Sequence, residues 1–176
     1  IVQRAPSRWN KRFGGKAVCT GKLADDRVEL AVGMRLTLVS PNAASLAALE
    51  KDWRSSVKKW AIMPGDLEAA WAQLVDENKF HPDAELTLGP GDLTADLLSQ
   101  LKGRDSGAAN GSSIAFLAEF GGKSCLFLAD AHAGVVCETL RDHGYTKDKP
   151  LKVDAMKMAH HGSRNNITPE LLELVD

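Results

Sequence analysis

The order of apolar patterns in the last third of the chain constrains the fold most. Two strand-like runs are separated by a glycine pair that suits a hairpin turn, and a helical, a strand-like and a second helical stretch follow. These segments are 113–120, 123–129, 133–142, 153–159 and the stretch that starts at Thr168-Pro169-Glu170. Thr168 is a typical N-cap residue, and Pro169 suits the first helical position. Strands that alternate with helices in this way indicate an α/β fold.

The first two thirds of the chain contain further patterns. Gly14 and Gly15 precede a short apolar run, which predicts a turn that leads into a strand. Apolar residues then alternate with polar ones, which is typical of strands, before the period changes to the three-to-four-residue spacing of amphipathic helices. The predicted elements are a strand in the apolar run after Gly15, strands over 28–30 and 34–40, and helices over 43–60 and 67–77.

Residues 78–111 contain much of the proline, glycine and aspartate of the chain. Their periodicity is weak, apart from one helical pattern at 93–101. We interpret this region as an inserted surface lobe or loop region within a single partial domain that spans residues 1–176.

Composition excludes several classes of protein. The 176 residues suit about one domain, and a composition of 44% apolar and 26% charged residues is wrong for a disordered chain. No apolar run approaches the ~18 residues that a membrane span needs, so we expect no membrane partner. The three cysteines are too few and too scattered for a disulfide framework, and we expect a reducing compartment, the cytoplasm. Because the sequence starts at Ile1, we expect that the natural N-terminus is missing.

Two of the predicted strands end at residues that can bind a metal ion. Asp130 follows the second hairpin strand, and His160 and His161 follow the next strand. A carboxylate and a neutral imidazole are ligands that Zn²⁺ accepts, and α/β proteins often assemble their sites at strand ends. Gly162 permits a close backbone approach, and Ser163 can donate a hydrogen bond. On pattern alone, Asp130 is equally well explained as a helix cap, and the histidine pair is more often part of a surface loop.

The longer pattern resembles a known family. Asn110-Gly-Ser-Ser leads into the hairpin that ends at Asp130-Ala-His132, and Val153-Asp-Ala-Met-Lys-Met-Ala-His-His-Gly-Ser163 follows. Together these segments resemble the second half of the metallo-β-lactamase-fold hydrolases. The most similar branch includes the hydrolase domain of DNA-uptake competence proteins and phosphorylcholine esterase. The resemblance implies a metallo-β-lactamase-like αββα sandwich, of which this chain holds largely the second half, incomplete at both ends.

The same resemblance implies roles for individual residues. Asp130 matches the aspartate that bridges two metal ions and is thereby essential for catalysis. His161 matches the last metal ligand. His160 matches the neighbour of that ligand, either as a group that supports the site or as an alternative ligand, and it is our candidate for the catalytic group that protonates the leaving group. His132 follows the bridging position by two residues, and it is a candidate for supporting the site without binding metal itself.

The implied function is that of a metal-dependent hydrolase of phosphodiester or other ester bonds. Two zinc ions, with manganese or iron as alternatives, would activate a water molecule for attack. Gly162 and Ser163 would hold an oxygen of the substrate, which would be a small-molecule or nucleic-acid phosphodiester. We assign this activity to the full-length parent protein.

The chain also departs from the family pattern. The HxHxDH signature, which supplies most of the metal ligands in the family's first half, is absent, and so are the strands that follow the terminal helix. Two or three ligands cannot complete a catalytic zinc site. The chain is therefore a fragment, or its missing half lies on another chain or in disordered residues, or the protein has lost its metals. We expect the chain alone to be inactive.

The competing hypothesis is a non-catalytic, degenerate module of the same fold that acts in protein interactions. Trp53, Trp60 and Trp71 lie on the two predicted helices and would form the interaction surface, although tryptophan at helical spacing is more often part of a core. A cluster of basic residues near the N-terminus, with aromatic residues between them, suits either a strip that follows phosphates or a solvated arm.

Overall fold

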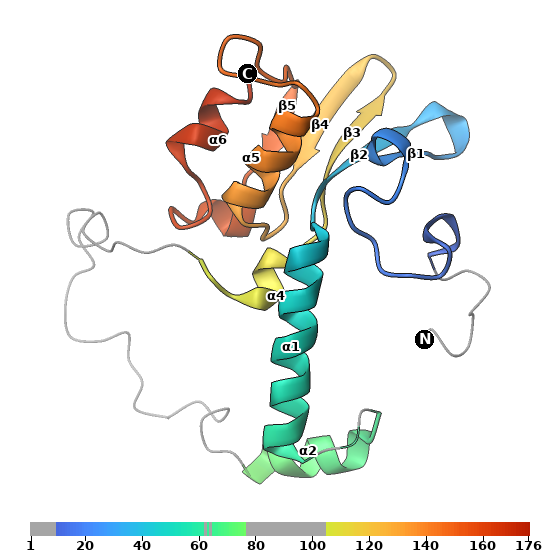
Figure 1. Ribbon diagram of the computed structural model, residues 1–176, viewed down its shortest axis with the longest axis vertical. Helices are drawn as coiled ribbons and strands as arrows, with labels where there is room; N and C mark the ends of the chain where they lie inside the picture. Colours follow the sequence, from blue (N-terminus) through green and yellow to red (C-terminus); the bar gives the residue numbers. More distant parts are fainter. Residues whose placement is uncertain (1–9, 62, 64, 77–104) are drawn as a thin grey trace, which may run out of the picture. The chain divides into compact units, whose positions relative to one another are not determined.

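The computed structural model describes residues 10–61, 63, 65–76 and 105–176 (Figure 1). The chain divides into two compact units, one of residues 1–49 and 103–176 and the other of residues 50–102. The predicted helix at 93–101 and the basic residues Arg4 and Arg8 lie outside the described residues.

The first unit contains a five-stranded mixed sheet (Figure 1). Its strands are β1 (Arg27–Glu29), β2 (Arg35–Ser40), β3 (Ala115–Phe120), β4 (Lys123–Phe127) and β5 (Ala155–Lys157), in that order across the sheet. The pairs from β1 to β4 are antiparallel, whereas β5 is parallel to β4. Helices pack on this sheet, so the α/β class is confirmed. The αββα arrangement with a second sheet remains a proposal.

Most of the predicted helices and strands lie close to their expected positions. The helices are α1 (Ala43–Trp60), α2 (Leu67–Asp76), α4 (Ala108–Gly111), α5 (Ala133–Asp142) and α6 (Pro169–Glu173). The Thr168 hydroxyl accepts a hydrogen bond from the Leu171 N–H at 3.2 Å, which confirms the N-cap. Gly121 and Gly122 form the hairpin turn with φ of 58° and 76°.

The turn predicted at Gly14-Gly15 is present, but the strand predicted after it is not. Residues 11–13 form a 3₁₀ turn, and Gly14 and Gly15 continue it with left-handed backbone. The apolar run that follows contains only Ala17, Val18 and Cys19, too short to pair along its length. Its hydrogen bond to the rest of the unit runs from the Thr20 N–H to the Pro41 carbonyl, at 2.8 Å.

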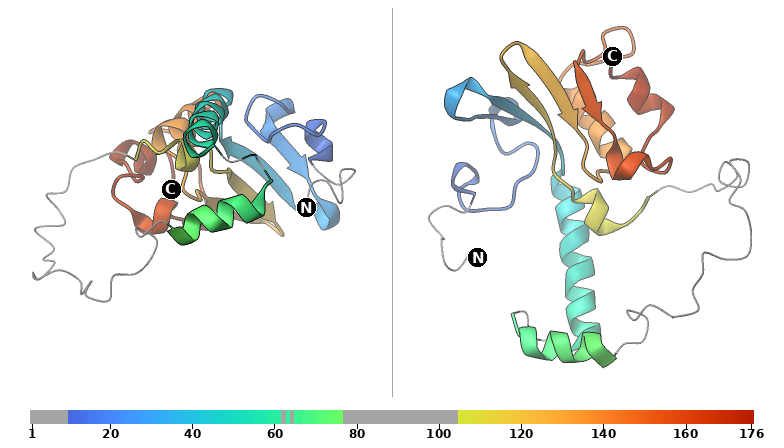
Figure 2. Two further views of the ribbon diagram at one scale, coloured as in Figure 1. Left: turned by 90° about the horizontal axis from the view of Figure 1, so that it is seen from below. Right: turned by 180° about the vertical axis from the view of Figure 1, so that it is seen from behind.

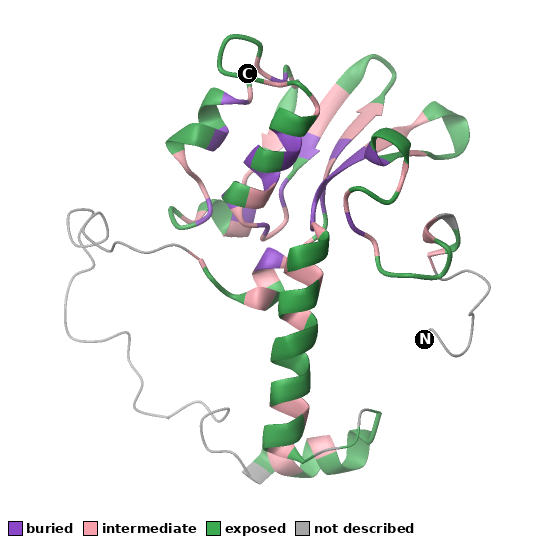
Figure 3. Ribbon diagram, in the orientation of Figure 1, coloured by how far each residue is buried: buried purple, intermediate pink, exposed green. Residues whose placement is uncertain are grey.

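The core lies between α5, α6 and one face of the sheet (Figures 2 and 3). Alternation along the strands points Leu117 and Leu126 toward these helices, and both side chains are buried. Val136 and Leu140 approach them from α5, and Leu171 from α6. This packing fixes the start of α5 beside the ends of β4 and β5, where the predicted site residues lie.

The opposite face of the sheet is apolar but only partly covered. Phe116 on β3 pairs with Phe127 on β4, and their rings stack with centroids 5.2 Å apart. Phe127 is 37% exposed, and Phe120 at the end of β3 is 51% exposed. A two-layered α/β protein normally packs a second layer on a face of this kind.

Candidate functional site at the ends of strands β4 and β5

Backbone hydrogen bonds tie together the two segments that follow β4 and β5. The Leu128 N–H donates to the Lys157 carbonyl at 3.3 Å, and the His160 N–H donates to the Ala129 carbonyl at 2.8 Å. The Asn166 side chain donates to the Asp130 carbonyl at 3.3 Å. The structure therefore brings Asp130 and His160 to the same edge of the sheet.

The backbone in both segments has a strained conformation. Ala129, His160 and His161 have φ of 47°, 44° and 56°, and Gly162 follows with 82°. The left-handed region costs an L-residue with a side chain about 1–2 kcal/mol. Strain of this kind concentrates at functional sites, where the surrounding structure holds it in place.

The histidine pair does not continue strand β5. If the strand continued to residue 161, alternation would place the two histidine side chains on opposite sides of it. Strand β5 ends at Lys157, however, and Ala159–Gly162 form a 3₁₀ turn. The imidazole of His160 is 40% exposed and faces the side chain of Asp105, whereas His161 is exposed. Their ring centroids are 6.0 Å apart.

Asp105 is the centre of a hydrogen-bond network beside this turn. Its Oδ1 accepts from the Gly107 N–H at 3.0 Å, and its Oδ2 accepts from the side chains of Asn110 at 2.7 Å and Asn166 at 2.9 Å. Only 12% of the Asp105 side chain is exposed. The hydrogen bonds from Asn166, Asn110 and Gly107, in that order of effect, hold the pKa of the Asp105 carboxyl well below its usual range, although burial opposes them.

The network fixes one edge of the His160 ring. Its Nδ1 lies 3.4 Å from Asp105 Oδ2 and 3.4 Å from Asn110 Nδ2. An imidazole whose Nδ1 faces a carboxylate is held in one orientation, with Nε2 on the far side of the ring. This is the arrangement that a proton-transfer residue needs.

His132 packs against the same network from the N-cap position of α5. Its Nε2 is buried without a hydrogen bond and lies 3.6 Å from Asp105 Oδ1, which is longer than a hydrogen bond. A Cβ added to Gly111 would lie 2.7 Å from Cε1 of this ring, so the ring requires glycine at position 111. A hollow of about 350 Å³ opens beside Asp105 and His132.

Gly162 and Ser163 complete the turn. The Ser163 N–H donates to the His160 carbonyl at 2.9 Å, so this N–H is already engaged. The Ser163 hydroxyl accepts from the Asn165 N–H at 3.3 Å and keeps its own hydrogen for another acceptor.

The residues that the structure describes do not form a complete metal centre. Among them, no group of three or more histidine, cysteine, aspartate or glutamate side chains is placed to hold an ion. Asp130 and His161 are two potential ligands from adjacent strand ends, whereas a catalytic zinc site needs three.

Sequence reasoning missed three residues of this network. Asp105 lies within the stretch interpreted as an inserted lobe, yet residues 105–111 belong to the same unit as the sheet. Asn110 opens the family-like pattern, and Asn166 follows the Gly162-Ser163 turn closely. The signal that could have found them was their closeness in the sequence to the predicted site residues. However, side chains such as Asp105 and Asn166 come together only when the chain folds.

No family model, no curated protein and no solved structure matches this chain. The described helices include none with the length and apolarity required to cross a membrane.

Proposed function

We propose that this chain supplies one half of the site of a metal-dependent hydrolase that cleaves phosphodiester or other ester bonds, in a metallo-β-lactamase-like fold. The observation that carries this proposal is the strained His160-His161-Gly162 turn, hydrogen-bonded to the segment that holds Asp130. The order of Asp130 and the histidine pair along the chain agrees with the family pattern that the sequence resembles.

The metal ligands are shared in this proposal. Asp130 and His161 are the ligands from this chain, and the remaining ones come from residues outside the described part or from another chain. Two zinc ions, with manganese or iron as alternatives, would activate a water molecule when bound. The described residues lack a complete ligand set, so beyond these two ligands this chain is assigned only substrate contacts and proton transfer.

His160 is the proton donor for the leaving group. Asp105 Oδ2 faces Nδ1 of its ring and can accept from the Nδ1–H, which orients the ring and leaves Nε2 to deliver the proton. The Ser163 hydroxyl retains a hydrogen that can be donated to a substrate oxygen.

The test uses the full-length parent, loaded with metal and assayed against nucleic acid, cyclic nucleotide and ester panels. Asp130→Asn keeps the shape of the side chain but removes its charge, so activity on the best substrate should fall by orders of magnitude while the fold survives. A variant that is as fast as the parent would show that the mechanism is wrong.

Metal content tests the ligand assignment separately. His161→Ala should lower the zinc, manganese or iron content of the parent more than His160→Ala, because Asp105 and Asn110 already occupy one edge of the His160 ring. Equal losses or the reverse order would contradict the assignment.

The second unit favours a different candidate function, an interaction module. Sequence patterns favoured burial of its tryptophans, but Trp53 is 60% and Trp71 68% exposed, together with Met63 and Leu67. Exposed apolar side chains in this number are typical of protein–protein contact surfaces. Elemental analysis of the parent separates the two candidates, because about two equivalents of metal support the hydrolase and their absence supports the module.

A further inference from the structure

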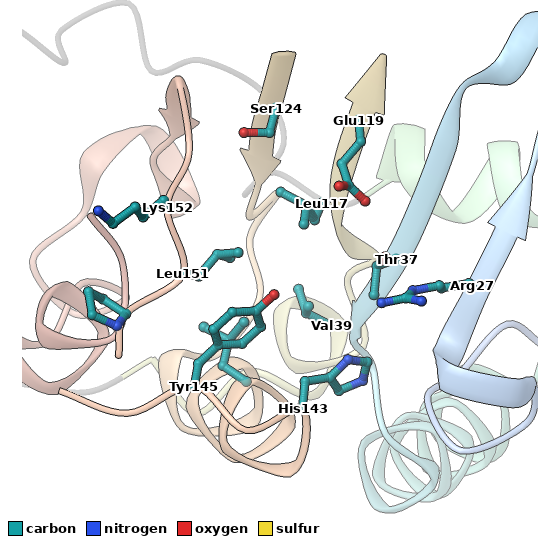
Figure 4. A pocket seen from close by; sticks show the side chains of 12 residues that line it. Arg27, Thr37, Val39, Leu117, Glu119, Ser124, His143, Tyr145, Leu151 and Lys152 are labelled. Carbon is teal, nitrogen blue, oxygen red and sulfur yellow. The ribbon is translucent and has the colours of Figure 1, made fainter. Parts of the chain in front are cut away.

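The first unit contains a second cavity, of about 330 Å³ (Figure 4). It lies toward the end of the sheet where β3 ends at Glu119–Phe120 and β4 begins at Lys123–Ser124. The end of α5 and the segment 145–152 enclose it. It shares no lining residue with the network around Asp105.

The cavity has an apolar floor. Val39 and Leu117 contribute from the sheet, Leu140 from α5 and Leu151 from the segment beyond it. All four side chains are at least 93% buried in the unit. A floor of this kind favours the apolar body of a ligand, because contact removes its surface from water.

Several polar side chains line the cavity and can donate hydrogen bonds, among them Arg27, Tyr145 and Lys152. Figure 4 shows the guanidinium of Arg27 and the imidazole of His143 among the side chains that line the cavity, and the hydroxyl of Tyr145 pointing into it. Arg27 lies 3.9 Å from Asp25, beyond hydrogen-bond distance, so its N–H groups remain able to bind a ligand.

Neighbouring residues hold the lining side chains in place. Nε2 of His143 lies 3.7 Å from the largely buried carboxylate of Asp26, and that carboxylate accepts a hydrogen bond from the Gly21 N–H. Glu119 on the far wall pairs with Arg35, whose Nη1 lies 3.5 Å away and whose Nε also donates to Glu29 at 3.2 Å. Arg27 forms an ion pair at 3.9 Å with the exposed Asp25, which does not line the cavity.

We propose that this cavity binds a small organic monoanion with a flat apolar body, of the arylcarboxylate class. The ring would lie on Val39, Leu117 and Leu151. The carboxylate would accept hydrogen bonds from Arg27 and from the Tyr145 hydroxyl, since guanidinium and carboxylate groups match in geometry. The site is independent of the proposed hydrolase activity.

The chain provides its own reporter, because Tyr145 is its only tyrosine. The experiment labels the full chain with ¹³C-tyrosine and follows the single tyrosine NMR signal while benzoate is added. Benzyl alcohol and benzylamine serve as the neutral and the cationic probe. Benzoate should shift the signal to saturation at a lower concentration than benzyl alcohol, and benzylamine should be the weakest of the three.

Arg27→Gln should weaken benzoate binding about tenfold, because a charge-assisted bidentate contact is lost. Arg27 is half-exposed, so the variant should stay folded, which circular dichroism checks. Lys147→Gln is the matched control, since it removes a positive charge outside the cavity and should leave binding unchanged. Equal binding of benzoate and benzylamine, or no saturable shift, would overturn the proposal, as would equal binding by both variants.

Discussion

At the scale of single residues, one carboxylate organises the candidate site. Asp105 lies far along the chain from both His160 and Asn166, yet its two oxygens hold three hydrogen-bond donors and face the imidazole of His160. No local pattern announces such a residue, because its role depends on partners that folding brings to it. By contrast, Asp130 and His161 follow predicted strands, and the family resemblance was enough to single them out.

Asp105 makes stability depend on pH in a definite direction. Its pKa is lowered in the folded state, so its contribution is fully present above the unfolded value of about 4 and is lost as the pH falls below it. Asp105→Asn should lower the free energy of unfolding by about 1–3 kcal/mol at neutral pH. The difference in unfolding free energy from the unmutated protein should shrink near pH 3. Urea unfolding at both pH values measures this. Asp148→Asn, on an exposed side chain, should have little effect, and a pH-independent deficit for Asp105→Asn would contradict the argument.

Alanine substitutions at Gly111 and Gly134 test the packing of His132. The Cβ of Gly111→Ala would lie 2.7 Å from the imidazole, so the ring must move, and we expect a loss of about 1–3 kcal/mol in unfolding free energy. The same change at Gly134 in α5 meets nothing within 4 Å and should be neutral or stabilising by about 0.5–1 kcal/mol. Thermal unfolding of the two variants side by side gives the answer. Similar melting temperatures would mean that the ring does not need the space at Gly111.

At the scale of elements, the sequence identified most helices and strands but not where each one ends. Apolar spacing and the signals Thr168-Pro169 and Gly121-Gly122 are local, so α5, α6 and the hairpin follow from them. Strand β5 was predicted to reach residue 159 but ends at Lys157, because the chain then adopts left-handed backbone at His160 and His161. The His160 N–H is hydrogen-bonded to the Ala129 carbonyl at 2.8 Å, a contact between distant segments that no single-strand pattern contains.

The cap of α6 should carry a measurable part of that helix's stability. Thr168→Ala removes the hydroxyl that accepts from the Leu171 N–H and should cost about 1 kcal/mol. Thr168→Ser keeps the acceptor and should cost much less. Chemical denaturation compares the two, and equal costs would show that the methyl group of Thr168 matters rather than the cap.

At the scale of the whole molecule, the partly exposed apolar face of the sheet should govern self-association. Phe116 and Phe127 stack on the face opposite α5, and contiguous exposed apolar surface drives association in water. We expect this chain to be oligomeric or poorly soluble when produced by itself. Phe127→Thr keeps a strand-forming residue but removes most of the exposed ring.

Sedimentation velocity should show a shift of Phe127→Thr toward smaller species. Leu172→Gln on α6 is the control, because it removes an exposed apolar side chain that does not lie on the sheet. If the unmutated chain is already monomeric, or if both variants change association equally, the sheet face is not the cause of self-association.

The pairing of Ser40 with Ala115 across β2 and β3 has a consequence for how this protein can change over evolution. The chain leaves the sheet after Ser40 and re-enters it at Ala115. The two ends of the intervening segment therefore lie about one strand spacing apart. The entropic cost of loop closure grows only with the logarithm of the length of the loop. Residues 50–102 can therefore be lengthened, shortened or exchanged with little effect on the sheet. New specificities can arise there without rebuilding the scaffold.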